Sequence, residues 1–360
     1  MSCIFVSDCE GPISKNDNAF EAAIQFIPFG AEFFSIISKY DDVLADIVKK
    51  PRYNAGDTLK LILPFLKAYN VTDAGLREFS AKTMVLIPGS KNTLEYIRNL
   101  VPSYVVSTSY EHYIKSLCET VNFPFDNTYC THLSLDKYAI PEQEKTRLRQ
   151  IAKDISQKPM IVIPSAAKSL EDFSKQDRET IEWLDDIFWN EISKMAIGEI
   201  IDDVKPIGGH EKAIAIIDAT RRASCSLSNV LYVGDSITDV EAYKLVREYD
   251  GLTVSFNGNE YAVRNAEVAV LSNNNTVTAV IAELFCKLKK EATLQALENW
   301  SQRTLCQTPV QREILERFFI LFPNRLPKVQ IVTTENMDAL CYESSKFRRR
   351  VRGEAVGRLG

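Results

Sequence analysis

Two carboxylates stand directly after a short apolar segment near the N-terminus. Residues 3–7 (CIFVS) lead into Asp8 and Glu10, and Gly11 follows where the chain has to turn away. A carboxylate pair at this spacing can act as a nucleophile and a general acid or base in one cavity. Such residues also occur as simple caps of backbone groups, so the pair alone leaves both interpretations open.

A second acidic pair follows another apolar segment, residues 229–233 (NVLYV). The pair consists of Asp235 and Asp239, and Asp239 falls at the predicted start of a helix. An acidic residue there commonly does no more than complement the helix dipole. The second pair therefore needs support from other residues before it indicates a functional site.

Hydroxyl groups and a lysine are placed where they could meet an anion. Residues 103–107 (SYVVS) end in Ser107, and Thr108 and Ser109 prolong the row of hydroxyls at a predicted strand-to-helix turn. Lys212 opens a predicted helix, where the helix dipole disfavours a cation unless an anion lies close by. Taken alone, these residues are more common as helix caps and surface side chains.

The elements that must position these residues alternate between strands and helices. Residues 252–256 (LTVSF) and 267–271 (EVAVL) add two more short apolar segments typical of buried parallel strands. Helices are predicted to follow the strands at residues 111–122, 211–223 and 238–248. This alternation predicts a doubly wound α/β fold, which presents ligands at the carboxyl ends of its parallel strands.

Two long segments exceed what a crossover between neighbouring strands needs. Both have apolar residues at helical spacing, so the first is predicted to form a helical cap and the second a further, mostly helical insertion. The resulting division is a core of residues 1–14, 86–127 and 200–285, a cap of 15–85, a second insertion of 128–199 and a C-terminal extension of 286–360.

The order of these residues resembles the four motifs of the haloacid dehalogenase superfamily: an acid, a hydroxyl, a lysine and two further acids. The resemblance covers well under half of the chain and includes the segments IPGSKNTLEYI and SFNGNEYAVRNAEVAVLS. A helical insertion directly after the first motif looks most like the phosphoserine-phosphatase branch. The motif DCEGPIS and the closing FRRRVRGEAVGRLG also resemble a poorly characterised archaeal group, some members of which are labelled energy-converting hydrogenase subunit R.

The resemblance implies a Rossmann-like core and a phosphatase or phosphotransferase that acts on a small phosphomonoester through an aspartyl-phosphate. Asp8 would attack phosphorus, Ser107 would donate a hydrogen bond to the phosphoryl group, and Lys212 would offset negative charge. Thr108 or Ser109 would take the serine role if the strand ended one residue later.

The resemblance also implies Mg²⁺ as cofactor. Asp8, Asp235 and the backbone carbonyl of Glu10 would coordinate the ion with oxygen, which Mg²⁺ prefers, and Asp239 would orient a metal-bound water.

Glu10 departs from the superfamily pattern, in which aspartate usually stands two positions after the nucleophile as general acid and base. Glutamate keeps the carboxylate but is one methylene longer, and Pro12 replaces the usual Thr or Val and fixes φ nearby. The alternative to an enzyme is therefore a catalytically weak or inactive binding or regulatory subunit of a larger complex. The other motif residues are intact, which favours the enzyme.

Charge and cysteine content restrict the expected partners. The formal net charge of -5 gives no general reason to expect binding to nucleic acid or to an anionic membrane. No apolar run approaches the roughly 20 residues of a membrane helix. The eight cysteines are scattered without a C-x-x-C pair, which predicts reduced thiols and a cytoplasmic location.

The chain ends in a basic cluster, KFRRRVR at residues 346–352. Three interpretations are open: a solvated face, a docking surface for an acidic protein partner, or a segment that folds back. Arg52, next to Tyr53 in a loop of the predicted cap, is either solvent-exposed or available to a second charge of the substrate. The three histidines show no mutual ligand spacing and are given no role.

Overall fold

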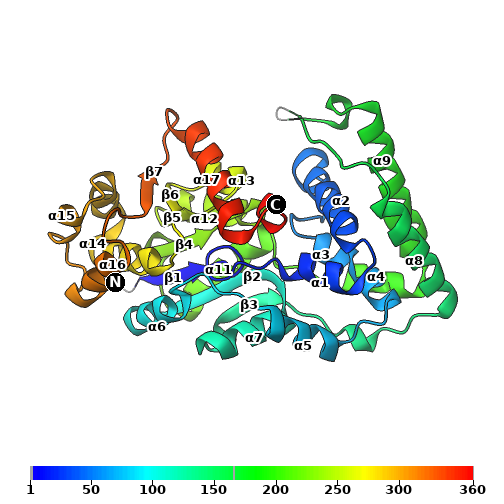
Figure 1. Cartoon of the computed structure of the whole chain (residues 1–360), viewed down its shortest axis with the longest axis horizontal. Coiled ribbons are helices and arrows are strands. Elements are labelled where there is room, and N and C mark those ends of the chain that lie inside the picture. The colour runs from blue at the N-terminus through cyan, green and yellow to red at the C-terminus, as the bar shows by residue number, and fades with distance from the viewer. Residues whose placement is uncertain (1–2, 165–166, 360) are drawn as a thin grey trace.

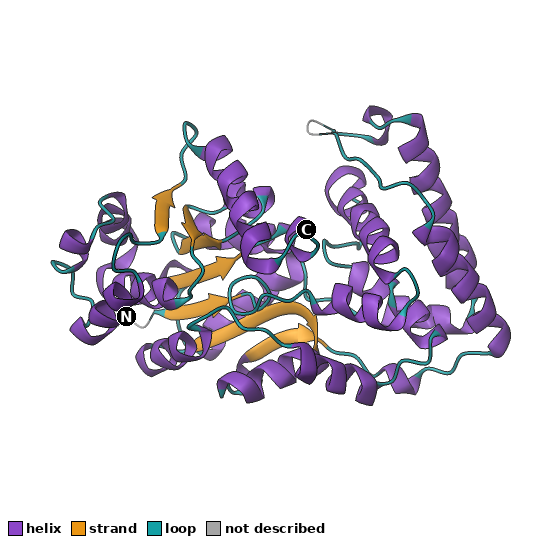
Figure 2. Ribbon diagram, in the orientation of Figure 1, coloured by secondary structure: helices purple, strands orange, loops and turns teal. Residues whose placement is uncertain are grey.

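The computed structural model describes residues 3–164 and 167–359, and a seven-stranded sheet lies at its centre (Figures 1 and 2). The strand order is β3-β2-β1-β4-β5-β6-β7, and only β7 is antiparallel to its neighbour. The predicted doubly wound α/β fold is confirmed. The strands are β1 (Ile4–Ser7), β2 (Ser103–Tyr110), β3 (Thr128–Thr131), β4 (Val230–Gly234), β5 (Leu252–Phe256), β6 (Val268–Leu271) and β7 (Lys328–Ile331).

Alternate residues of the central strands face two different hydrophobic clusters, as the period of a strand requires. In β1, Phe5 belongs to one cluster, whereas Ile4 and Val6 belong to the other. The cluster of Phe5 is covered by α6 (Ser90–Leu100), α7 (Glu111–Val121) and α14 (Thr276–Glu298). The opposite face is covered by α11 (His210–Arg222), α12 (Val240–Glu248) and α13 (Glu260–Asn265).

All five predicted strands are present, and β3 and β7 are two further strands at the edges of the sheet. Both edge strands have four residues, and half or more of the residues in each are only partly buried or exposed. Their sequences, TYCT and KVQI, therefore lack the continuous apolar run that marks the central strands. Both also lie outside the residues predicted for the core.

The helices of residues 15–85 and 128–199 pack together beyond one end of the sheet (Figure 1). They share one hydrophobic cluster, in which α8 contacts both α2 and α4. The division of the chain into a separate cap and a second insertion stays a prediction. The main helices here are α1 (Asn18–Phe26), α2 (Gly30–Asp42), α3 (Thr58–Leu61), α4 (Leu63–Ala68), α5 (Asp73–Thr83), α8 (Glu142–Ser156), α9 (Lys175–Asp186) and α10 (Glu199–Asp203).

The C-terminal extension returns the chain to the middle of the molecule. After α15 (Gln302–Leu305), α16 (Arg312–Leu321) and β7, the last long helix, α17 (Met337–Arg352), packs against α13. Figure 1 shows that the C-terminus then lies between the sheet and the helices of the cap region. Among the described residues, no helix combines the length and apolar character needed to cross a membrane.

A disulfide joins Cys3, at the start of β1, to Cys286 in α14, with Cα atoms 5.4 Å apart. The expectation that all eight thiols are reduced is therefore wrong for this pair. The two cysteines are 283 residues apart, so their proximity depends on how α14 packs on the sheet and leaves no local signal in the sequence. The cytoplasmic location inferred from reduced thiols stays a prediction.

Candidate active site

The carboxyl ends of β1, β2 and β4 meet at one cavity of ≈ 100 Å³. Asp8 and Asp235 follow β1 and β4, and Ser107 lies within the second half of β2. All three line the cavity, as does Glu10. The strands are neighbours in the order β2-β1-β4, so residues about a hundred positions apart become adjacent. The structure thus brings the sequence-predicted residues together at the expected edge of the sheet.

Lys212 connects the two acidic motifs. Its Nζ lies 2.7 Å from Oδ2 of Asp8 and 2.7 Å from Oδ1 of Asp239, and all three side chains are at least nine-tenths buried. Lys212 is the third residue of α11, where the helix dipole opposes a cation. The two carboxylates provide the compensating negative charge.

Burial and charge shift the pKa values of this group in different directions. Burial raises the pKa of Asp8 to about 7, because the attraction of Lys212 only partly opposes desolvation and repulsion from Asp239 and Asp235. Burial disfavours the ammonium of Lys212, but Asp239 and Asp8 outweigh it and raise the pKa of Lys212. The pKa of Asp239 is lowered, because Lys212 and hydrogen bonds overcome its desolvation.

Asp239 is held by four hydrogen-bond donors. Oδ1 accepts from Lys212 Nζ at 2.7 Å and from the Tyr232 hydroxyl at 2.6 Å. Oδ2 accepts from the backbone N–H groups of Asp235 and Ser236 at 2.8 and 2.9 Å. Asp239 therefore orients Lys212 and shapes the turn that carries Asp235.

Asp235 lies against the turn after β1. Gly11 has a φ of +99°, and a Cβ atom there would come within 2.1 Å of Asp235 Oδ2. A glycine is therefore required both by the left-handed backbone and by the close approach. The turn is tightened by the N–H groups of Ile13 and Ser14, which both donate to the carbonyl of Cys9.

The donor set of the site fits Mg²⁺. Asp8, Asp235 and Asp239 each offer one carboxylate oxygen, and these oxygens lie within 4.8 Å of one another. All three residues are buried, and hard oxygen ligands are what Mg²⁺ prefers. Asp8 and Asp235 line the cavity, whereas Asp239 does not, so Asp8 and Asp235 are the residues that would hold an ion.

Glu10 lines the cavity but is tied to the start of α1. Its Oε1 accepts a hydrogen bond from the backbone N–H of Asn18 at 2.7 Å. Burial and the nearby Asp17 carboxylate raise its pKa well above the usual range of glutamate, despite the opposing hydrogen bond from Asn18. Glu10 is therefore biased towards its protonated form, which a general acid needs.

The row of hydroxyls near the carboxyl end of β2 extends along the cavity. β2 continues to Tyr110, beyond the predicted end at Ser107, and Ser107, Thr108 and Ser109 all line the cavity. Ser107 Oγ donates to Ser109 Oγ at 3.2 Å, whereas Thr108 Oγ1 donates to the carbonyl of Ile207 at 3.0 Å. Two neighbouring serine hydroxyls are thus available for the predicted hydrogen bond to a phosphoryl group.

Two residues of the C-terminal basic cluster enter the cavity and were not predicted as site residues. Arg348 and Arg352 line it and form ion pairs with Asp235. Of the three interpretations of the tail, folding back is the one that applies to these two residues. Lys346 and Arg350 are exposed. The only sequence signal was the four-residue spacing of Arg348 and Arg352, which places them on one helical face.

The remaining residues considered from sequence lie away from the cavity. Arg52 is exposed, while the Tyr53 hydroxyl donates to Asp41, a cavity-lining carboxylate that was not predicted. His112 is buried against Asp73, and its Nε2 lies 3.0 Å from Oδ1 of Asp73. No histidine is among the described residues that line the cavity.

The structure defines a doubly wound α/β protein with an acidic site at the carboxyl edge of its sheet. A solved structure similar to the whole chain is that of gene product AF1437 from Archaeoglobus fulgidus, with 25% identity and a TM-score of 0.80. The similarity covers 100% of this chain and 99% of that one. The shared architecture therefore includes the C-terminal extension.

Other solved structures are similar at lower scores. A phospho-aspartyl intermediate analogue of phosphoserine phosphatase has 12% identity and a TM-score of 0.44, with 76% of this chain and 95% of that chain covered. A HAD family hydrolase, t0658 from Salmonella enterica subsp. enterica serovar Typhi, has 12% identity and a TM-score of 0.43, with 73% and 65% covered. No protein-family model and no curated protein matches the sequence.

Proposed function

We propose that the protein is a haloacid-dehalogenase-like, magnesium-dependent phosphatase or phosphotransferase that acts on a small phosphomonoester. The observation that carries this proposal is the buried contact of Lys212 with both Asp8 and Asp239, at 2.7 Å each, beside Asp235. A lysine between the acids of two strand ends can balance a carboxylate nucleophile and a transferred phosphoryl group.

The chain's own residues account for each proton and bond in the proposed reaction. Asp8 attacks phosphorus, the bond from phosphorus to the leaving alkoxide breaks, and Glu10 gives its proton to that oxygen. Water then attacks phosphorus and gives a proton to Glu10, the bond between phosphorus and the Asp8 oxygen breaks, and phosphate leaves. Mg²⁺ held by Asp8 and Asp235 would neutralise charge on the phosphoryl oxygens.

The alternative is a binding or regulatory protein with little turnover. It is favoured by the 2.7 Å hydrogen bond that ties Glu10 to the Asn18 N–H, because a general acid must reach the leaving oxygen. Exposed residues of the basic tail, such as Lys346 and Arg350, would then be available to an acidic partner. The two functions differ in whether the wild-type protein releases phosphate.

The decisive experiment measures phosphate release from a panel of small phosphate esters, with Mg²⁺ and with a chelator. We expect metal-dependent release by the wild type and none by Asp8→Asn. The variant should remain folded, because Asn still offers Lys212 an acceptor and removes a carboxylate whose ionisation burial opposes. Asp126→Asn, a change at an exposed position, is the control. An inactive wild type, or an active Asp8→Asn, would contradict the proposal.

A further inference from the structure

Helix α17 carries two arginines into a cavity whose other charged residues come from distant parts of the chain. We propose that Arg348 and Arg352 form an anion-binding pair that receives the phosphoryl group of the substrate. The identity of that anion rests on the proposed function. The anion-binding role itself rests on the position, burial and charge of the two side chains.

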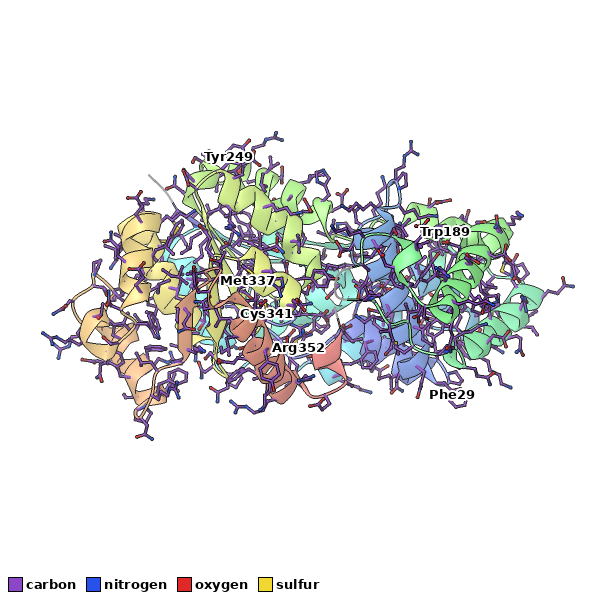
Figure 3. All side chains as sticks on the ribbon, turned by 90° about the horizontal axis from the view of Figure 1, so that it is seen from above. Phe29, Trp189, Tyr249, Met337, Cys341 and Arg352 are labelled. Carbon is purple, nitrogen blue, oxygen red and sulfur yellow. A yellow bond between two sulfur atoms is a disulfide. The ribbon has the colours of Figure 1, made fainter. Side chains whose placement is uncertain are left out.

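The helix holds the two arginines in a defined position. Figure 3 shows Met337, Cys341 and Arg352 in succession along α17, with Arg352 at the end nearer the part of the molecule that holds Phe29 and Trp189. Cys341 is buried in a small apolar cluster with residues of α13 and β6.

One turn before Arg348, the Ser344 hydroxyl donates to the carbonyl of Gly258 at 2.6 Å. The face of α17 that bears both arginines is thus fixed against the core.

Both guanidinium groups are almost completely buried. The side chains of Arg348 and Arg352 are 3% and 4% exposed. Arg352 donates to Asp235 Oδ2 at 2.9 Å and to the carbonyls of Lys15 and Asn16. Arg348 donates to the same Oδ2 atom. Buried cations of this kind need compensating negative charge.

The contacts within the protein leave one donor of the arginine pair unsatisfied. Both arginines share Oδ2 of Asp235, and Arg348 also donates to the carbonyls of Asp235 and Leu359 at 3.2 and 3.4 Å. Arg348 Nε, however, is buried without a hydrogen-bond partner among the described residues, which is unfavourable until a ligand or water accepts from it. The Asp17 carboxylate also lines the cavity and attracts both guanidinium groups. A phosphoryl group would add negative charge and give Arg348 Nε the acceptor that it lacks.

The same cavity brings the arginines to the reacting groups. Asp8, Ser107, Arg348 and Arg352 all line it. An anion bound in this cavity would therefore lie among all four side chains. Arginine is suited to this role because its planar fork donates in parallel to phosphate oxygens.

A structural alternative is that the arginines only neutralise Asp235. The alternative predicts that their removal changes the stability of the protein or its affinity for Mg²⁺ but leaves anion binding unchanged. The affinity for inorganic phosphate therefore separates the two roles, and its measurement does not require turnover.

The test is calorimetric titration of the full-length protein with inorganic phosphate, at a Mg²⁺ concentration that saturates the wild type and each variant. We expect Arg348→Gln and Arg352→Gln each to weaken phosphate binding about tenfold or more, since each removes a charge-assisted donor. Arg348→Lys, which keeps the charge but not the fork, should fall between the wild type and Arg348→Gln. Lys346→Gln removes one charge from an exposed position of the same helix and should stay within about twofold of the wild type.

The inference would be overturned if Arg348→Gln and Arg352→Gln bound phosphate within twofold of the wild type. It would also be overturned if Lys346→Gln lost as much phosphate affinity as they do, or if the wild type bound no phosphate. If Arg348→Gln fails to fold, Arg348→Lys and Arg352→Gln carry the same test. Arginine-dependent binding without ester hydrolysis would contradict the proposed function alone. Hydrolysis with unchanged phosphate binding in the variants would contradict the arginine pair alone.

Discussion

Glu10 is the residue at which an efficient phosphatase and a binding protein differ most. It lines the cavity, and burial together with Asp17 raises its pKa well above the usual range. Its proton is therefore available at a pH where an ordinary glutamate would be ionised. Its Oε1 accepts a 2.7 Å hydrogen bond from the N–H of Asn18, the first residue of α1. Glu10 can act as a general acid only if the carboxyl reaches the leaving oxygen from this position.

We expect Glu10→Gln to lower the rate with a poor alkoxide leaving group by about two orders of magnitude, because the leaving oxygen loses its proton donor. An activated aryl phosphate leaves without protonation and should be affected less in the first step. Mg²⁺ affinity should change little, since only the backbone carbonyl of Glu10 is proposed as a ligand. Steady-state rates on both esters and a Mg²⁺ titration measure these effects.

Glu119→Gln, on the exposed side of α7, is the matched control for that experiment. It should leave both rates unchanged. Equal rates for the wild type and Glu10→Gln on the alkyl ester would remove Glu10 from the mechanism.

At the scale of elements, α5 and α7 are joined by a buried histidine. His112, the second residue of α7, lies with Nε2 3.0 Å from Oδ1 of Asp73, the first residue of α5. Burial lowers the pKa of His112, and the positive charge of Lys115 lowers it further. The carboxylates of Asp73 and Glu111 oppose this shift, because they favour the charged imidazole. The folded protein thus prefers the neutral imidazole, whereas the unfolded chain takes up a proton near pH 6.5.

Because the unfolded state binds the extra proton, the His112 contribution to stability is present above about pH 6.5 and is lost as the pH falls below it. The slope from this one group cannot exceed about 1.4 kcal/mol per pH unit. When the pH is lowered from 7 to 5, we expect the free energy of unfolding to fall less for His112→Gln than for the wild type. Urea unfolding at several pH values measures this difference. His132→Gln, whose side chain is 78% exposed in the wild type, should follow the wild type. Parallel curves for His112→Gln and the wild type would contradict the expectation.

At the scale of the whole molecule, the Cys3–Cys286 disulfide ties the N-terminal strand to α14 across 283 residues of chain. A cross-link over so long a loop restricts the unfolded chain strongly. We expect reduction or Cys3→Ser to lower the free energy of unfolding by about 2–4 kcal/mol. Denaturant unfolding with and without a reductant measures the change.

Cys306→Ser, at an exposed free thiol, is the control and should leave the response to reductant intact. Identical unfolding curves of the wild type with and without reductant would show that the bond contributes nothing to stability in solution.

The sequence by itself determined the α/β architecture and the residues at the strand ends. Asp8, Ser107 and Asp235 each follow or end an apolar segment of the sequence, and the carboxyl ends of parallel strands necessarily share one edge. Lys212 was predicted from the resemblance in motif order, since a lysine at a helix start is by itself more common as a surface side chain. These inferences depend on local patterns, on one general rule of sheet topology and on that resemblance.

Only the tertiary structure decided which distant segments of the chain pack at the carboxyl edge of the sheet. The spacing of Arg348 and Arg352 defines a helical face, but the neighbouring residues do not indicate which surface that face packs against. The same holds for the disulfide, and for β3 and β7, whose short segments become strands only by pairing with a sheet that is already formed. Contacts between distant segments are set by the packing of the whole chain, which leaves no period or spacing in the residues that make them.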